Sequence, residues 1–422
     1  MIKMNINNIA LFSLFHHDVF YENETFDYKT NVLEELSKEN TSVSYEDIAE
    51  NLLNIIKKNI QNIPLDKISL TLTGGMDSRI ILACLLKLGI KPNCLTYGDS
   101  LAKDVLISKI IGDKYGLKVH NPINNSPDSK MYERWVDSVI QIDNGNSHLH
   151  RAHRFAAISE HVKNFDTKVL FTGHMGGEGI RGLTYNNYFA SSFYENVNKK
   201  NNPFKEQVSS ILPNYFVNKD KLDLDLLYKQ VLNLSWMKNN SKINELYFLY
   251  DLIGKIHHYQ DIKLYHSFVP NVVPVYLQKS YLEMLFSSQH HFLRKQNGFL
   301  GNLQNPKLYC QLLKIIYPSL LHVPLSNGYS PSEYTKGLHY YLPIRIWRKY
   351  INKQPSFPSF TYGEWYRDFV NKKSSEIDEE IWSYFNKVDY FNCFNSKNHQ
   401  KNEGYWHRFS NPIFFDLILK NK

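Results

Sequence analysis

The stretch of sequence that decides the fold is TLTGGMDSR, residues 71–79. It follows ISLTLT (68–73), a run rich in apolar and β-branched residues, and it precedes RIILACLLKLG (79–89), which has helical spacing and stops at a glycine. A strand, a turn with paired glycines and a helix are therefore expected in that order. Such a turn lets the backbone approach a phosphate, and the first N–H groups of the helix then point at the anion.

The same alternation of strand and helix continues along the chain. NCLTY (93–97) predicts a second strand, LAKDVLISKIIGDKYG (101–116) a second helix, and LKVH (117–120) a third strand. RFAAISEHVKNF (154–165) is helix-like, and TKVLFTG (167–173) predicts a buried strand that opens into a second glycine-rich loop. This order predicts an α/β fold in which helices flank a parallel sheet. Ligands of such sheets bind beyond the carboxyl ends of the strands, where both glycine-rich loops fall.

The length of the chain predicts more than one core. It has 422 residues, 43% of them hydrophobic, and single cores stop growing at about 250–300 residues. After about residue 190, segments such as DLDLLYKQVLNLSW (223–236), KSYLEMLFSSQ (279–289) and PKLYCQLLKIIY (306–317) predict helices separated by loops rather than strands. We expect four parts: a short N-terminal segment (1–43), the α/β domain (44–190), a helical region completing it (191–340) and a C-terminal extension (341–422).

Charge and cysteine content exclude some classes of protein. The net charge of +8 is spread thinly, and its densest patch, RIWRKYINK (345–353), fits a solvated helix face better than an RNA contact, so nucleic acid is an unlikely partner. The four cysteines lack the spacing of a zinc site, which favours reduced thiols. NIALFSLF (8–15) is too short to span a bilayer, and a cytoplasmic protein without a membrane partner is expected.

The glycine turn, residues 73–78, has the composition of an anion site. Thr73, Gly74, Gly75 and Ser78 would supply donors to a phosphate, whereas the Asp77 carboxylate would repel one. Asp77 therefore implies a bridging cation, most simply Mg²⁺, which binds one or two carboxylates together with phosphate oxygens. The Walker A pattern is absent. The alternative is an ordinary strand-to-helix turn in which Asp77 caps the helix.

TLTGGMDSR resembles the Ser-Gly-Gly-x-Asp-Ser signature of the PP-loop, or N-type ATP pyrophosphatase, families. These enzymes cleave ATP to AMP and pyrophosphate while they adenylate a carboxyl or carbonyl oxygen. Within them, residues 40–335 most resemble the synthetase domain of asparagine synthetases and their β-lactam-forming relatives. The resemblance implies ATP and Mg²⁺ as cofactors, with ATP bound by the 44–190 domain.

Three further segments are similar to that family. In 97–120 the strand-end loop, here Tyr97 and Gly98, would lie against adenine. In KVLFTGHMGGEGIRG (168–182), Gly173 and Glu178 fall on a family glycine and glutamate. VPNVVPVYLQKSYLEML (269–285) resembles the Pro-Phe-Leu-Asp segment, with Leu277 in place of the aspartate.

The second loop, residues 173–183, departs from the family pattern. His174 stands where the family has a catalytic acidic residue, and it could act as a general base near neutral pH. The alternative is a loop histidine that is hydrogen-bonded to a neighbouring carbonyl. Gly177 replaces a Mg²⁺-ligating aspartate, and Glu178 is the expected substitute ligand beside Asp77, with a catalytic role of its own.

The segment LLHVPLSNGYSP (320–331) departs from the family as well. The family has a lysine there that stabilises charge on the phosphoryl group, and His322 occupies that place in the best register. Arg294, Lys295 and Lys336 are alternative cations, each more often a surface charge.

The resemblance implies an ATP-dependent ligase that forms an amide or amidine bond. Residue 2 is Ile rather than the cysteine of a glutaminase site, so nitrogen is expected from ammonia, a separate glutaminase or an amine on the substrate. The acceptor is expected to be a small molecule or a peptide. Two alternatives stay open: a tRNA-modifying PP-loop ligase, and a catalytically lapsed relative that still binds nucleotide.

Overall fold

The computed structural model describes the chain in separate ranges. These are residues 5–15, 42–143, 149–177, 204–233, 258–290, 307–325, 328–336, 340, 342–344, 346–347, 363–396 and 403–420. Most of the basic segment 345–353 therefore lies outside the described residues.

The centre of the fold is a five-stranded sheet whose pairs are all parallel, in the order β3-β2-β1-β4-β5. The strands are β1 (Ile68–Thr71), β2 (Asn93–Leu95), β3 (Val119–His120), β4 (Val169–Thr172) and β5 (Asn271–Pro274). Helices cover both sides, because β1 and β4 are buried apolar runs that need cover on each face. The predicted α/β class with a parallel sheet is confirmed.

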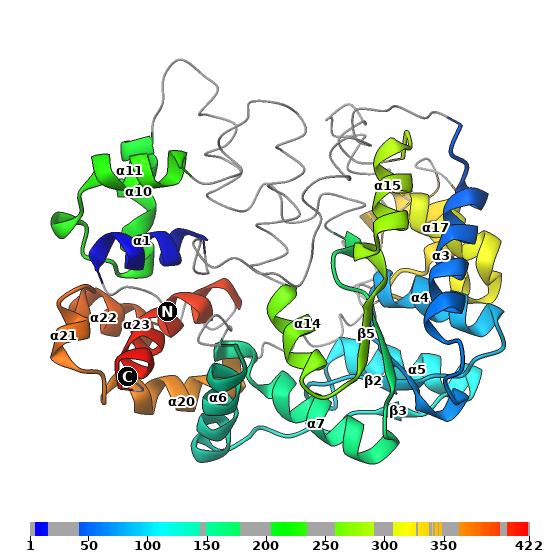
Figure 1. The fold of residues 1–422 in the computed structure, drawn as a ribbon, viewed down its shortest axis with the longest axis horizontal. Helices are drawn as coiled ribbons and strands as arrows, with labels where there is room; N and C mark the ends of the chain where they lie inside the picture. The colour runs from blue at the N-terminus through cyan, green and yellow to red at the C-terminus, as the bar shows by residue number, and fades with distance from the viewer. Residues whose placement is uncertain are drawn as a thin grey trace.

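Two groups of helices sandwich the sheet, as Figure 1 shows. In one group α3, α4 and α17 pack together, and in the other α6, α7 and α14 do. The helices of this half are α3 (Tyr45–Asn59), α4 (Asp77–Lys87), α5 (Lys103–Tyr115), α6 (Ser129–Asp143), α7 (His153–Phe165), α14 (Tyr259–His266), α15 (Lys279–Ser287), α17 (Lys307–Ile316) and α18 (Pro331–Thr335). Short 3-10 helices are η1 (Leu65–Lys67), η2 (Leu149–Arg151), η8 (Val275–Leu277) and η10 (Pro318–His322).

Strand β5 corrects the expectation of loops without strands after residue 190. Its four residues, NVVP, pair with β4 at the edge of the sheet, where Pro274 stands opposite Thr172. Proline lacks a backbone N–H and is tolerated at a sheet edge. The strand was missed because four residues are too few to establish a period, and its pairing comes from a segment about 100 residues earlier in the chain.

The chain ends meet in a second helical group. It contains α1 (Ile6–Phe15), α10 (Phe204–Ile211), η4 (Leu212–Tyr215), η5 (Lys219–Lys221), α11 (Leu224–Leu232), α20 (Gly363–Ser374), α21 (Glu379–Trp382), α22 (Lys387–Asn395) and α23 (Glu403–Lys420). Phe12 of α1 stacks on Phe414 of α23 with ring centroids 4.7 Å apart, and the Asn411 amide donates to Ser13 Oγ at 3.2 Å. Figure 1 shows α1 beside α10 and α23.

The helices after residue 340 also contact the α/β half of the molecule. Tyr366 of α20 lies against Tyr132 of α6, with ring centroids 5.4 Å apart, and Lys372 pairs with Glu133 at 3.0 Å. Trp365, also on α20, meets the edge of His153 at the start of α7, at 5.7 Å between centroids. The C-terminal helices therefore support the helices that carry one wall of the candidate site.

A chain of buried polar groups crosses the middle of the sheet. His161 of α7 is fully buried; its Nε2 lies 3.0 Å from Ser69 Oγ of β1, which lies 2.8 Å from Thr167 Oγ1. Its Nδ1 lies 3.3 Å from His120 Nδ1. Burial, and then the neighbouring His120, lower the pKa of His161 from 6.5 to about 3. His161 is therefore neutral in the folded protein at neutral pH.

We expect acid to destabilise the protein through His161. Below pH 6.5 the unfolded chain protonates this side chain, whereas the folded chain does so only near pH 3, so stability is lost as the pH falls between these values. At pH 5 the loss is about 2 kcal/mol from this group alone. Denaturant unfolding at pH 7 and pH 5 should show a smaller loss for His161→Gln than for the wild type. His322→Gln, which removes an exposed histidine, is the control. Equal losses of stability between pH 7 and pH 5 in all three proteins would contradict the low pKa of His161.

Candidate functional site

The site lies where the sheet changes direction. From β1 the chain adds β2 and β3 on one side, then crosses to add β4 and β5 on the other. β1 and β4 are adjacent parallel strands on either side of this reversal, so the loops that follow them leave the same edge of the sheet, where a crevice is expected at the carboxyl ends of the strands. The glycine turn follows β1, and the second loop follows β4.

A cavity of about 420 Å³ occupies this crevice. Its size falls in the range of roughly 300–1,000 Å³ found for small-molecule sites. The lining comes from the ends of β1 and β2, from both loops, and from η2, α5, α7 and α14. Its ionisable side chains are those of Asp77, Tyr97, Asp104, Arg151, Arg154, His174, His258, Asp261 and Tyr265.

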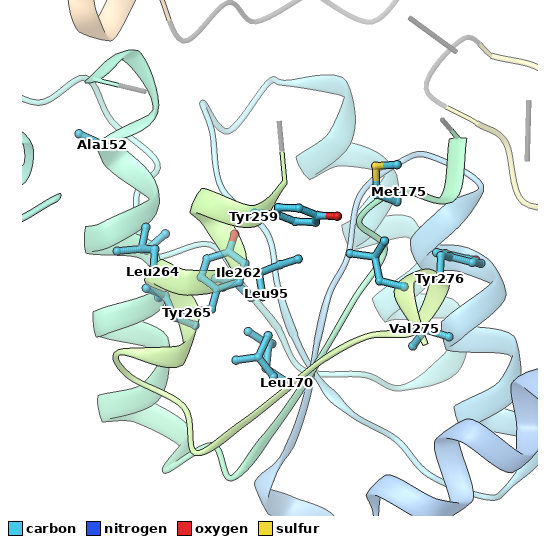
Figure 2. Close-up of a cluster of buried hydrophobic side chains, with 14 of the residues drawn as sticks. Leu95, Ala152, Leu170, Met175, Tyr259, Ile262, Leu264, Tyr265, Val275 and Tyr276 are labelled. Carbon is cyan, nitrogen blue, oxygen red and sulfur yellow. The ribbon is translucent and has the colours of Figure 1, made fainter. Parts of the chain in front are cut away.

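Buried apolar side chains support the cavity from the sheet side. Figure 2 shows Leu95 of β2, Leu170 of β4 and Ile262 of α14 in one cluster with Tyr265. Leu95 and Tyr265 also line the cavity, so this cluster fixes its apolar surface.

The glycine turn is held by hydrogen bonds within the protein. The Thr73 N–H donates to Ser78 Oγ at 3.1 Å, and the Gly75 N–H donates to Thr73 Oγ1 at 3.3 Å. The Gly74 N–H donates to the Asp104 carboxylate of α5 at 3.0 Å. Three of the N–H groups that the sequence offered to a phosphate thus have protein acceptors, and the turn is already shaped.

Asp77 does not cap the helix. It is the first residue of α4, whose N-cap is Met76, and no side chain accepts a hydrogen bond at that cap. The Asp77 carboxylate instead accepts a hydrogen bond from the Tyr309 hydroxyl, and its backbone carbonyl accepts one from the Tyr276 hydroxyl at 2.7 Å. The capping alternative is therefore wrong, and the carboxylate lines the cavity.

The described part of the second loop, residues 173–177, packs directly on the start of α4. A Cβ atom added to Gly176 would lie 2.7 Å from Asp77 Cγ and 2.8 Å from Tyr276 Cε2. One added to Gly173 would lie 3.1 Å from the Ser78 backbone nitrogen. Between them Met175 adopts the left-handed conformation, with φ of 65°. These glycines permit the two loops to touch, and so they set the position of Asp77.

His174 lies between a hydroxyl and a carboxylate. Its Nδ1 is 2.9 Å from Thr172 Oγ1 and its Nε2 is 3.6 Å from Asp261 Oδ2. Burial lowers the pKa of His174 well below its usual value, and His258, Arg154 and Arg151 lower it further. The ring is therefore neutral. The proton is best placed on Nε2, facing the carboxylate, and Nδ1 then accepts from Thr172. In that tautomer no lone pair of the ring points to the cavity.

Arg154 forms the cationic wall of the cavity. Its guanidinium pairs with the Asp261 carboxylate of α14 and lies over the Tyr97 ring, 5.6 Å from the centroid. Tyr97 in turn meets His153 edge-on at 5.5 Å. A carboxylate on one side and a ring on the other hold Arg154 in place, and its charge is exposed to the cavity together with that of Arg151.

Arg79, although part of the opening motif, has a structural role. It is fully buried on α4 and donates to the carbonyls of Val323 at 2.6 Å and Pro324 at 2.8 Å. Burial lowers its pKa to about 10, so it stays charged. It ties the segment after η10 to α4.

The structure brings together most of the residues predicted from the sequence. Thr73, Asp77, Ser78, Tyr97, Gly173 and His174 line the cavity. Gly74 and Gly75 lie in the turn beside it, while Gly98 is held outside the lining by its hydrogen bonds to Ile123 and Asn121. His322 is exposed at the end of η10, Lys336 is exposed beside Tyr340, and neither lines the cavity. Glu178, Arg294 and Lys295 lie outside the described residues.

The sequence analysis missed Asp104, Arg151, Arg154, His258 and Asp261 as site residues. Asp104 had a signal, since it opens the helix after the second strand, whose end faces the same edge of the sheet. Arg154 and Asp261 are the first-turn residues of helices with no local feature that distinguishes them from solvent-exposed charges.

No family matches the chain, and no curated protein matches it either. In the part of the chain that the structure describes, no helix is both long and apolar enough to cross a membrane. Within the same ranges, no group of 3 or more His, Cys, Asp or Glu side chains is arranged to hold a metal ion.

We expect alanine at Gly176 to displace the two loops. The added Cβ would overlap the Asp77 carboxylate, and overpacking of this kind costs about 1–3 kcal/mol. Thermal unfolding should show a larger loss of stability for Gly176→Ala than for Gly173→Ala, where the closest approach is 3.1 Å.

Gly89→Ala is the matched control for backbone strain. Gly89 has φ of 75°, and nothing lies within 4 Å of an added Cβ. This variant should lose about 1–2 kcal/mol of stability through the positive φ alone, without any steric overlap. Unchanged stability in Gly176→Ala would rule out the close contact between the loops.

Proposed function

We propose that this protein is an ATP-dependent ligase of the PP-loop type, which adenylates an oxygen of its acceptor and lets a nitrogen nucleophile displace AMP. One observation carries the proposal: the two loops that resemble the family touch each other at Asp77, at the carboxyl ends of adjacent parallel strands. They border a cavity of suitable size. The resemblance and the placement are independent, because the motif alone does not bring the loops together.

The residues of the cavity fit a nucleotide polyphosphate with its metal. Asp77 and Asp104 place carboxylates beside the turn, and Arg151 and Arg154 place positive charge in the same cavity. Mg²⁺ would be held by Asp77 together with phosphate oxygens and would neutralise their charge. Tyr309 donates to the same carboxylate and orients it.

The chemical roles of the chain follow from charge and position. An acceptor oxygen attacks the α-phosphorus, pyrophosphate leaves, and the nitrogen nucleophile then displaces AMP. Arg154, fixed by Asp261 and Tyr97, provides a preorganised charge for the phosphoryl oxygens, which is commonly the largest contribution to catalysis. It takes the role that the sequence analysis gave to His322.

His174 has a different role in this proposal from that of a base. Its Nε2 lies 3.6 Å from Asp261 Oδ2, too far for a hydrogen bond, and the ring packs as a neutral group beside the carboxylate that holds Arg154. The nitrogen nucleophile would then arrive as a free amine or as ammonia that needs no strong base. A base role for His174 stays a prediction and requires Thr172 to release Nδ1.

A lapsed relative that binds nucleotide without reaction is the second candidate. The observation that favours it is the internal hydrogen bonding of the turn, in which Thr73, Gly74 and Gly75 all donate to protein acceptors. Gly177, at the family's metal-ligand position, carries no side chain that could compensate.

The first test is pyrophosphate release from Mg·ATP with pooled small-molecule extract and ammonium. We expect release by the wild type and a loss of at least about 100-fold in Asp77→Asn, because the charge that faces the metal is removed. Tyr309→Phe keeps that charge and removes only the hydroxyl that orients it, so its loss should be much smaller. ATP binding without release by the wild type would favour the lapsed relative.

A second test concerns Arg154. Arg154→Gln should weaken Mg·ATP binding about tenfold or more, because a charged hydrogen bond contributes about 1.5–3 kcal/mol. The substitution also leaves the Asp261 carboxylate buried without this partner, which lowers stability.

The double variant Arg154→Gln/Asp261→Asn separates these two effects in calorimetric titration and thermal unfolding. It should recover stability but not affinity. Recovery of affinity in the double variant would show that Arg154 has no direct contact with the nucleotide.

A further inference from the structure

Asp104 supplies the negative charge among the acceptors that hold the glycine turn. The Thr73 and Gly75 N–H groups donate to hydroxyl oxygens, whereas the Gly74 N–H donates to the Asp104 carboxylate at 3.0 Å. Asp104 lies 30 residues further along the chain, in the first turn of α5, and it lines the cavity. A carboxylate of this chain thus takes the N–H that a phosphate oxygen would use.

The surroundings of Asp104 hold its side chain at the turn. Burial raises the pKa of Asp104 above its usual value, and the Gly74 N–H and the neighbouring Lys103 offset only part of that rise. Ser108 of the same helix donates to the Leu72 carbonyl at 3.1 Å, which fixes α5 against the end of β1. The carboxylate is therefore held at the turn by its helix as well as by its own hydrogen bond.

A free polyphosphate at the glycine turn meets two carboxylates, those of Asp77 and Asp104, whereas the third carboxylate of the cavity, Asp261, is paired with Arg154. The charge of Asp77 would bind a divalent cation, which would lie between this carboxylate and the phosphates. Asp104 competes with phosphate for the Gly74 N–H and repels an uncompensated anion. Neutralising the phosphate charge with a divalent cation removes most of that repulsion.

We propose that Asp104 is the residue that makes this cavity select the metal complex of a nucleoside triphosphate over the free triphosphate. The inference rests on the proposed function, since it assumes that a polyphosphate binds at the glycine turn. It gives Asp104 a role in specificity that is distinct from the metal-binding role of Asp77.

The experiment is titration calorimetry of the full chain with ATP, in excess Mg²⁺ and in EDTA. Asp104→Asn keeps an oxygen that can accept from Gly74 and removes the charge. We expect its affinity for metal-free ATP to rise about tenfold while its affinity for Mg·ATP changes less than about threefold, since the substitution removes like-charge repulsion. Inorganic pyrophosphate in EDTA should give the same rise, because the effect concerns the phosphates and not the base.

Asp113→Asn is the matched control. Asp113 is exposed on the same helix, so this variant removes one charge from α5 far from the turn, and its affinities should equal those of the wild type. Asp104→Ala removes both charge and acceptor, and thermal unfolding of each variant reports whether the turn is still supported. Asp104→Ala should gain less affinity for metal-free ATP than Asp104→Asn, because its glycine turn is less ordered.

The outcomes separate the two proposals. Wild-type protein that binds neither Mg·ATP nor pyrophosphate overturns the proposed function. If the wild type binds ATP and Asp104→Asn prefers Mg·ATP over metal-free ATP by the same factor as the wild type, only the role of Asp104 is overturned. An equal loss of affinity for Mg·ATP and for metal-free ATP in both Asp104→Asn and Asp104→Ala also overturns the role of Asp104 in specificity. Asp104 would then act only as a support for the turn.

Discussion

The contact between Gly176 and the Asp77 carboxylate is the constraint on which the site depends. No side chain fits between them, so the second loop can lie on the start of α4 only with glycine at that position. Because β1 and β4 are adjacent and parallel, the two loops leave the sheet at the same edge. The contact fixes the Asp77 carboxylate at the cavity, and Tyr276 and Tyr309 then hold the backbone and side chain of the same residue.

Charge in the cavity is arranged in opposed groups. Carboxylates lie at the turn, where Asp77 begins α4 and Asp104 accepts from Gly74. Arg154 lies on α7, where the ion pair with Asp261 and the Tyr97 ring restrict its position. Fixed charges of both signs around a partly buried space interact more strongly than the same groups would in water. The C-terminal helices contribute to this arrangement, because Trp365 packs on His153 and His153 on Tyr97.

Much of the α/β half followed from local patterns. The runs 68–73, 93–97, 117–120 and 167–173 each contain a strand of the sheet, and the helices α4, α5 and α7 were expected as well, whereas α6 was not. Part of the candidate site could be predicted from the sequence in the same way. Residues of the glycine turn, Gly173 and His174 line or border the cavity, because the ends of parallel strands share one edge of the sheet. Strand β5 could not be predicted from the sequence, because its four residues form a strand only by pairing with β4.

The sequence by itself determined the order of the first four strands and of the helices α4, α5 and α7, and the two places where the backbone must be free of side chains. Those properties depend on neighbours within a few residues, through hydrophobic period and glycine. The tertiary structure alone decided which charges surround the turn, because Asp104, Arg154 and Asp261 lie 30 to nearly 190 residues from Gly74. It also left His322 in solvent and neutralised His174, since exposure and pKa depend on packing and not on register in a motif.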